Sequence, residues 1–394
     1  MDLRFSERVS SLKGSAIREI FKFAGNPQVI SLAGGNPAPE LFPNEQLAVI
    51  AKELLENQPT LSLQYGVTEG YGELRQQVKK RLAAKENIDT EANDVIIVSG
   101  GQQAIDLTTK IFVNEGDTVI VEEPSFIGAL NAFRSYNANL AGVPMDGDGM
   151  NIDELERTIK ENKNVKLIYT IPTFQNPSGI TMSQQRRRAL YEIARKYDLL
   201  IIEDNPYGEL SFNGEHHDTI KSIDIDGRVI YCGSFSKILS PGLRVGFMCA
   251  APEIIAKATV AKQTTDVHTP MLTQLLASEY LKRYDIDELI EKMRVLYSEK
   301  CSTMLNAIDT YFPKEISHTV PTGGLFVWVT LPEQYDALQI SKKCAANNVI
   351  YVPGNTFMVD MDKKCSSLRL NYSTMPNERI VEGIKILGNV FSEL

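Results

Sequence analysis

The segment VIYCGSFSKILSPGLRVG, residues 229–246, contains the feature that decides the fold. It begins with a short apolar, β-branched run, which predicts a buried strand. The chain then turns at a glycine and presents two hydroxyls, an amine and a guanidinium: Ser234, Ser236, Lys237 and Arg244. A single lysine after a strand is usually solvated. A lysine flanked by serines, with an arginine nearby, offers a phosphate pocket with an amine beside it.

Similar apolar runs occur elsewhere in the chain, and helical spacing separates several of them: Val95–Val98, Thr118–Val121, Val165–Ile171, Leu199–Ile202 and Val245–Cys249. Before the fourth of these runs, Ser183 is predicted to cap a helix whose Leu190, Ile193, Ala194 and Tyr197 share one face. Strands that alternate with helices predict an α/β fold with a mostly parallel sheet covered on both sides. Because such sheets bind ligands at the C-terminal ends of their strands, unusual residues at those ends are candidate site residues.

Two of these runs end in segments that are ambiguous when taken alone. The first run is followed by Gly101 and Gln102 at a strand-to-helix turn, where glycines let backbone amides approach an anion. A plain tight turn explains that segment equally well. The third run is followed by Asn176 and Pro177, a pair that by itself favours an ordinary turn.

The fourth run continues into Glu203 and Asp204 and then reaches Tyr207. An acid that emerges from an apolar strand is costly to bury unless it meets a cation. A helix cap or a turn residue at the rim of the sheet is a real alternative. These simpler explanations weaken when the strand ends are taken together, because a parallel sheet would bring an amine, a carboxylate, a phenol and an anion cradle to one edge.

The pattern of the chain predicts three parts: an N-terminal arm, helix and loop (1–43), a large domain (44–290) and a small C-terminal domain (291–394). In the first part, a short helix is predicted around Ser15–Ala24, followed by a loop rich in glycine and proline. In the last part, a long helical stretch over Asp287–Ile308, shorter strand segments and a closing helix near Glu378–Phe391 predict an α+β domain.

Composition excludes several classes of function. The 394-residue chain carries a net charge of −9, which argues against nucleic acid or an anionic membrane as its main partner. The basic run Arg186–Arg188 lies in a predicted helix, and we interpret it as a solvated helix face. No metal site is expected, because the four histidines show no ligand spacing: His216, His217, His268 and His318.

The expected location is a reducing cytoplasm. The five cysteines are scattered and show no zinc or redox spacing. The first residues lack the apolar core of a signal peptide, and no apolar run approaches membrane-spanning length.

The ordered set of motifs resembles the fold-type I pyridoxal-phosphate enzymes, specifically the class I/II aminotransferases. The resemblance is strongest to the branch that contains 2-aminoadipate, kynurenine and aromatic aminotransferases, and it runs from about Ser15 to the C-terminus. It implies a large domain with a mostly parallel seven-stranded sheet between helices, plus a smaller α+β domain. Each motif alone is weak, but the set is highly specific: Asn176–Gly179, Asp204–Tyr207, Ser234–Lys237 with Arg244, and Leu368–Tyr372.

The resemblance implies a catalytic role for Lys237, Asp204 and Tyr207. Lys237 would hold pyridoxal 5'-phosphate as a Schiff base and, once freed, would shuttle a proton, which requires a partly neutral amine. Asp204 would pair with the pyridine nitrogen of the cofactor. Asn176 and Tyr207 would hydrogen-bond its phenolic oxygen. Phe126 would stack on the ring, and its alternative is an ordinary core aromatic.

The same resemblance implies a phosphate cradle and a shared dimer site. The cradle consists of two hydroxyls, a guanidinium and two backbone amides: Ser234, Ser236, Arg244, Gly101 and Gln102. Tyr65 resembles a tyrosine that reaches the phosphate of the neighbouring subunit, so a homodimer is expected. A turn or core tyrosine is the alternative.

Substrate recognition is also implied by the resemblance. Arg369 matches the arginine that grips the substrate α-carboxylate as a bidentate pair, with a surface salt bridge as the alternative. Arg18 resembles an arginine on an N-terminal helix that meets the distal carboxylate of acidic substrates, although helical arginines are usually solvated. Gly35 and Asn36 would line the same pocket, and Asn176 would also contact the substrate.

The implied activity is reversible transfer of an amino group from an L-amino acid to a 2-oxo acid such as 2-oxoglutarate. The donor would be 2-aminoadipate, an aromatic or kynurenine-like amino acid, or a branched one, and the kinetics would be ping-pong through pyridoxamine phosphate. A C–S lyase or a decarboxylase could use the same residues. A non-catalytic aminotransferase-like sensor is disfavoured, because the family-like region begins near residue 15 and the charge is acidic. A nicotinamide dehydrogenase is disfavoured because no Gly-x-Gly-x-x-Gly follows a strand.

Overall fold

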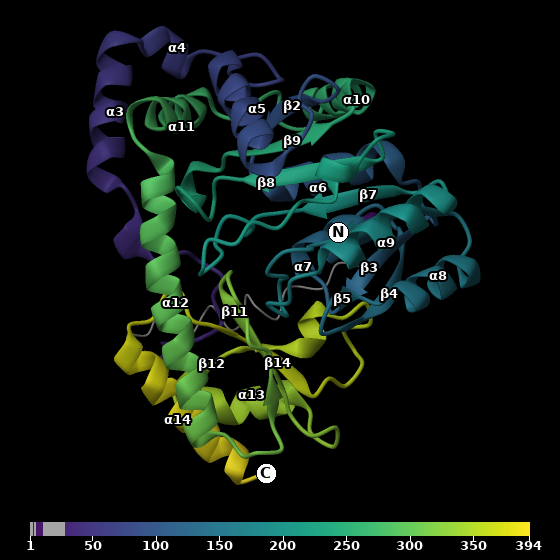
Figure 1. Cartoon of the computed structure of the whole chain (residues 1–394), viewed down its shortest axis with the longest axis vertical. Helices are drawn as coiled ribbons and strands as arrows, with labels where there is room; N and C mark the ends of the chain where they lie inside the picture. Colours follow the sequence, from purple (N-terminus) through teal and green to yellow (C-terminus); the bar gives the residue numbers. More distant parts are fainter. Residues whose placement is uncertain (1–2, 4, 11–27) are drawn as a thin grey trace.

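The computed structural model describes residues 3, 5–10 and 28–394 (Figure 1). The helix predicted around Ser15–Ala24 lies outside these residues.

An eight-stranded sheet forms the centre of the larger part of the molecule, in the order β2-β9-β8-β7-β6-β3-β4-β5. β9 runs antiparallel to both of its neighbours, β5 runs antiparallel to β4, and the pairs among β8, β7, β6, β3 and β4 are parallel. The strands are β2 (Asp94–Val98), β3 (Thr118–Glu123), β4 (Asn139–Asp146), β5 (Gly149–Met150), β6 (Val165–Thr170), β7 (Leu200–Asp204), β8 (Val229–Ser234) and β9 (Gly246–Ala250).

The predicted α/β class is confirmed, but the sheet has one strand more than the resemblance implied. The additional strand is β5, a two-residue strand that turns back on β4. β4 itself matches none of the apolar runs in the sequence. It contains Gly142 and Pro144, and most of its residues are partly or fully exposed, so it lacks the pattern of a buried strand.

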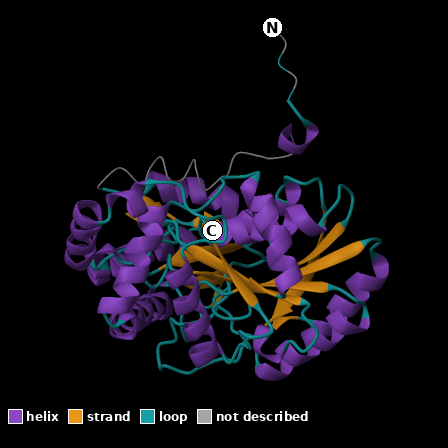
Figure 2. Cartoon of the chain, turned by 90° about the horizontal axis from the view of Figure 1, so that it is seen from above, coloured by secondary structure: helices purple, strands orange, loops and turns teal. Residues whose placement is uncertain are grey.

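Helices cover both faces of this sheet (Figure 2). The helices of this part are α5 (Gly72–Glu86), α6 (Gly101–Phe112), α7 (Ile127–Arg134), α8 (Ile152–Glu161), α9 (Gln184–Lys196), α10 (Pro252–Gln263) and α11 (Met271–Arg283). Because side chains alternate along a strand, one set packs in the core cluster that includes residues of α6 and α7, and the other set packs against α8 and α9. Ile120, Ile168 and Ile201 belong to the α8 and α9 set, whereas Val121, Tyr169 and Ile202 belong to the α6 and α7 set.

The predicted helix after Ser183 is confirmed as α9, and the Ser183 hydroxyl accepts the Arg186 N–H at its start. The interpretation of Arg186–Arg188 as a solvated face is wrong for its middle residue. Arg187 is fully buried, whereas Arg188 is exposed. The reason is helical spacing, since Arg187 lies on the same face as the buried Leu190, Tyr191 and Ala194.

The C-terminal part contains a second, four-stranded sheet in the order β10-β11-β14-β13. Its elements are β10 (Ser317–His318), β11 (Phe326–Thr330), α13 (Ala337–Ala346), β13 (Val352–Pro353), β14 (Ser367–Asn371) and α14 (Asn377–Ser392). The long helix α12 (Ile286–Tyr311) runs alongside both sheets in Figure 1 and passes position 290 without a break. The domain boundaries at 43/44 and 290/291 remain predictions.

An N-terminal segment joins the C-terminal part. β1 (Ile30–Ser31) pairs in parallel with β12 (Val349–Ile350), and Asn371 N–H donates to the Leu32 carbonyl at 2.8 Å. The remaining elements are α1 (Glu7–Ser10), α3 (Asn44–Asn57), α4 (Pro59–Leu63) and the 3-10 turns Pro39–Leu41, Lys221–Ile223, Pro241–Leu243 and Gly354–Phe357.

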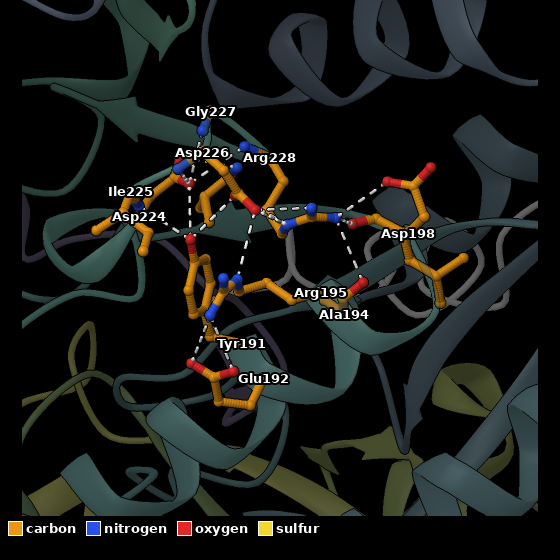
Figure 3. Close-up of polar contacts among 12 residues, drawn as sticks. Tyr191, Glu192, Ala194, Arg195, Asp198, Asp224, Ile225, Asp226, Gly227 and Arg228 are labelled. Atoms are coloured by element: carbon orange, nitrogen blue, oxygen red, sulfur yellow. Dashed lines mark hydrogen bonds and ion pairs between the residues drawn. The ribbon is translucent and has the colours of Figure 1, made fainter.

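A polar network fastens the end of α9 to the loop before β8 (Figure 3). The Tyr191 hydroxyl donates to Asp226 at 3.0 Å and accepts the Ile225 N–H at 2.9 Å. Arg228 donates to the Leu199 carbonyl at 2.9 Å and forms an ion pair with Asp226 at 2.8 Å. This network lies at the edge of the sheet opposite the predicted site, and it fixes the position of α9 against β7 and β8.

Asp224 is the buried acid of that loop, and its loss should destabilise the fold. Its carboxylate accepts the N–H groups of Gly227 and Val229, each at 3.0 Å, and pairs with the buried Lys221 at 2.7 Å. We expect Asp224→Ala to lower the free energy of unfolding by about 3–5 kcal/mol, because it leaves a buried cation uncompensated. Equilibrium unfolding in urea measures this.

Glu56→Ala is the control, because Glu56 is an exposed acid that pairs with the exposed Lys52. It should change the free energy of unfolding by no more than about 0.5 kcal/mol. Equal effects of the two substitutions would contradict the role assigned to Asp224.

Candidate active site

A cavity of about 350 Å³ opens at the C-terminal edge of β7 and β8. Most of the site residues predicted from the sequence line it, together with Ile105, Ile127, Ile171, Pro206 and Phe326. The predicted residues that it brings together are Gly35, Gly101, Gln102, Phe126, Asn176, Asp204, Tyr207, Ser234, Ser236, Lys237, Arg244 and Arg369.

Lys237 presents its amine to the cavity. Its Nζ donates to the Gly35 carbonyl at 2.7 Å. Burial, together with the nearby positive charges of Arg369 and Arg244, lowers the pKa of this amine from 10.5 to about 8. The amine is therefore partly neutral near physiological pH, which a nucleophile or a base requires.

Asp204 is a buried acid that lines the same cavity. Its Oδ2 accepts the Tyr169 hydroxyl at 2.8 Å. Burial raises the pKa of the carboxyl from 3.8 to about 7, against the opposing effect of this hydrogen bond. Among the described residues, no lysine or arginine forms an ion pair with it, so the site would stabilise a cationic ligand atom at this point.

Arg369 lines the cavity from β14 of the C-terminal sheet. Its guanidinium lies over the rings of Phe326 and Phe357, at 4.2 and 5.0 Å from their centroids. It donates to Asn176 Oδ1 at 2.8 Å and to the Ala33 carbonyl at 2.7 Å, while its buried Nε–H has no acceptor in the described part of the chain. Burial lowers its pKa to about 10. A ligand carboxylate would satisfy the free donor and offset the desolvation.

An anion cradle lies at the start of α6. No side chain caps this helix, so the first-turn N–H groups of Gly101 and Gln102 are available to an anion. Gly100 has φ +84°, and a Cβ there would lie 2.4 Å from the Arg244 guanidinium, which explains why glycine occupies the turn. The Ser234 hydroxyl, 2.9 Å from the Ser236 hydroxyl, completes the cradle.

Two of the predicted residues that the structure describes do not line the cavity. Tyr65 is 82% exposed and contacts the ring of His268 edge-on. Asn36 is exposed, and only its carbonyl is engaged, by the Ser373 hydroxyl at 2.5 Å. Arg18 lies outside the described residues.

The structure also adds residues that the sequence analysis missed. Tyr169 lies within an apolar strand, where its hydroxyl gave no separate signal. Phe326 and Phe357 come from the C-terminal part, and nothing in their local sequence indicates that they flank an arginine 12 or more positions away. Their contacts with the Arg369 guanidinium in the folded protein identify them.

Comparison with known proteins identifies the family. The model of the family described as "Aminotransferase class I and II" matches residues 27–387. This chain belongs to the class I and II aminotransferases. It is 44% identical to aromatic-amino-acid aminotransferase 1 of Thermococcus litoralis over 99% of this chain and 94% of that protein.

Two solved structures extend the comparison. The kynurenine aminotransferase of Pyrococcus horikoshii, in complex with PMP, matches with a TM-score of 0.95 and 40% identity over 99% of this chain and 97% of that one. The alpha-aminoadipate aminotransferase of Thermus thermophilus, complexed with N-(5'-phosphopyridoxyl)-L-leucine, matches with a TM-score of 0.91 and 38% identity over the same shares.

The cofactor of this aminotransferase is pyridoxal phosphate. The residues present fit the group: an amine with a lowered pKa, a buried acid that no described lysine or arginine pairs with, and an uncapped helix start face one cavity. Within the described ranges, no three acidic, histidine or cysteine side chains gather as metal ligands. None of the helices described is both long and apolar enough to cross a membrane.

The lowered pKa of Lys237 makes a prediction about the cofactor-free protein. Below pH 8 the folded protein buries a cation, whereas between pH 8 and 10.5 the amine is neutral when folded and protonated when unfolded. Stability therefore rises with pH across that window. We expect Lys237→Met to stabilise the cofactor-free protein by about 2 kcal/mol at pH 7, after allowance for the lost Gly35 hydrogen bond.

Urea unfolding of both proteins between pH 7 and 10.5 measures this difference, which should shrink as the pH rises. The control is Lys166→Met at an exposed position, which should show no such trend. A difference between Lys237→Met and the parent that stays constant with pH would contradict the prediction.

Proposed function

We propose that this aminotransferase transfers the amino group of an aromatic, kynurenine-like, 2-aminoadipate or branched L-amino acid to a 2-oxo acid such as 2-oxoglutarate. The observation that supports this best is the cavity itself, which is lined by the Lys237 amine, the buried carboxyl of Asp204 and the buried guanidinium of Arg369. The names of the similar proteins support the range of donors.

Lys237 would hold the cofactor and, once released, would move a proton at the substrate Cα. Its lowered pKa supports both steps, since a fully protonated amine can do neither. The bound cofactor supplies an electron-withdrawing ring. Asp204 would keep the ring nitrogen protonated, and its own pKa would fall when it meets that cation.

The remaining cofactor contacts follow from the same cavity. Asn176 and Tyr207 would donate to the phenolic oxygen, and Phe126 would lie against the ring. The hydroxyls, guanidinium and amides of the cradle would hold the phosphate: Ser234, Ser236, Arg244, Gly101 and Gln102.

Arg369 would bind the substrate α-carboxylate. Its free Nε–H and its position between two phenyl rings support this role. Gly35 lines the same cavity, and Asn36 and Arg18 would border the substrate side chain from the N-terminal segment. We also propose a cytoplasmic location, which the five free, buried cysteines support.

The activity test is a half-reaction. Each candidate amino acid is added to the cofactor-loaded enzyme, and the 2-oxo acid and the amino form of the cofactor are measured. We expect both products in equal amounts with at least one donor class. Release of pyruvate and ammonia instead would contradict transamination.

Arg369→Lys should lower kcat/KM for that donor by about 10- to 100-fold, because lysine keeps the charge but loses the bidentate geometry. Steady-state kinetics measures this. The exposed Arg157, changed to lysine, is the matched control. If the two variants had the same kcat/KM, Arg369 would not bind the carboxylate.

The exposed ring of Tyr65 supports a homodimer in which this residue completes the phosphate cradle of the partner subunit. Hybrid dimers test it. In a dimer of one Lys237→Ala chain and one Tyr65→Ala chain, the subunit that retains Lys237 receives an intact tyrosine from the other.

We therefore expect activity in the mixture well above that of either variant alone, approaching half of the parent activity per dimer formed. If Tyr65 served its own subunit, no intact site would form and the mixture would stay as inactive as the two variants. A monomer by light scattering would also reject the proposal.

A further inference from the structure

The segment 171–182, here called the Asn176 loop, connects β6 to α9. It carries Asn176, which lines the cavity and accepts the Arg369 guanidinium at 2.8 Å. Residues 171–179 are buried, although the segment has no regular secondary structure. Its conformation must therefore be held by side chains, because buried backbone polar groups need partners.

Arg187 holds both ends of the Asn176 loop from the α9 side. Its guanidinium donates to the Pro172 carbonyl and the Thr173 hydroxyl, each at 2.8 Å. Its Nε donates to the Met182 carbonyl at 2.9 Å. One planar fork thus joins the residues that enter and leave the loop, a geometry that lysine cannot reproduce.

Arg187 is itself held in place by α9. The C-terminal half of this helix is fastened to the loop before β8 by the network of Tyr191, Arg195 and Arg228 (Figure 3). This attachment therefore fixes the position of the N-terminal half of α9, which carries Arg187, relative to the C-terminal ends of the strands.

Glu122 holds the same loop from the end of β3. Its carboxylate is buried and accepts the Thr170 hydroxyl at 2.5 Å, the Ile171 N–H at 3.2 Å and Gln175 Nε2 at 3.0 Å. Gln175 immediately precedes Asn176, and its side-chain oxygen accepts the Ser178 N–H at 2.8 Å. Glu122 therefore positions the residues on both sides of Asn176.

Neither charge serves as the partner of the other. Every hydrogen bond described here from Arg187 or Glu122 goes to the Asn176 loop or to Thr170 just before it. Buried charges cost several kcal/mol each, and apolar side chains of similar volume often stabilise a core better. Stability alone does not explain two such residues around one loop, whereas control of its conformation does.

We propose that Arg187 and Glu122 are positioning residues that hold Asn176 in the orientation needed at the cofactor and at Arg369. This inference rests on the role proposed above for Asn176. Neither residue lines the cavity, so both act through the loop and not on the reacting atoms.

The first test compares Arg187→Lys with Arg188→Lys, its exposed neighbour on the same helix. In the cofactor-loaded enzymes, we measure kcat and the pH midpoint of the visible absorption change, which reports hydrogen bonding to the phenolic oxygen. Asn176→Ala provides the reference shift. We expect Arg187→Lys to lower kcat by about 10-fold or more and to move the midpoint in the direction of Asn176→Ala. Arg188→Lys should change neither.

A double-mutant cycle separates positioning from general loss of stability. If Arg187 acts through Asn176, adding Arg187→Lys to the Asn176→Ala variant should have little further effect on kcat or on the midpoint. Additive effects would overturn the proposal. So would an Arg187→Lys enzyme that has only a lower melting temperature. If Asn176→Ala itself changes nothing, the proposed role of Asn176 fails, and that outcome is distinct from failure of the inference.

Substitutions of Glu122 test the proposal independently, and they serve as the main test if Arg187→Lys fails to fold. Glu122→Gln can keep the contacts, because the Thr170 hydroxyl can accept from the new amide while the amide oxygen still accepts from the loop. Glu122→Leu removes them. We expect Glu122→Gln to stay within about threefold of the parent kcat, and Glu122→Leu to show the shifted midpoint of Asn176→Ala. Identical midpoints in Glu122→Leu and the parent would overturn the role of Glu122.

Discussion

At the end of β7, two consecutive carboxyl groups leave the sheet toward opposite faces, and the organisation of the site depends on this alternation. Asp204 faces the cavity and accepts from Tyr169. Glu203 lies on the face covered by α9, and it accepts the N–H groups of Ile220 and Lys221 in the segment between β7 and β8. The strand period of two thus gives the edge of the sheet a reactive face and a supporting face.

The reactive face combines buried charges of both signs that are not paired with one another. Burial shifts the pKa of Asp204 upward and those of Lys237 and Arg369 downward. Each group is displaced toward its neutral form because water is excluded and no counter-charge replaces it. A ligand with a cationic ring nitrogen, a reactive aldehyde and a carboxylate would complement all three. These groups are desolvated when the protein folds, so they are already oriented when the ligand binds.

The sequence was informative where function is concentrated in short segments at strand ends. Lys237, Asp204 and Asn176 lie shortly after the ends of predicted strands, so a parallel sheet was sufficient to bring them together. The sequence was less informative about the residues that hold the site residues in place. The face that buries Arg187 follows from its helical spacing with Leu190 and Ala194, but three consecutive arginines suggested a solvated helix. The contacts of Arg369 with Phe326 and Phe357 depend on tertiary packing, which no local pattern encodes.

Arg369 connects parts of the chain that no single element joins. Through Ala33 it contacts the N-terminal segment, through Asn176 it contacts the large sheet, and its own strand belongs to the C-terminal sheet. Because its two protein acceptors come from different segments, the direction of its free Nε–H depends on all three being in place. Displacement of any one segment would misdirect the donor. The side chain proposed to bind the substrate carboxylate therefore also links the substrate site to the correct assembly of the whole fold.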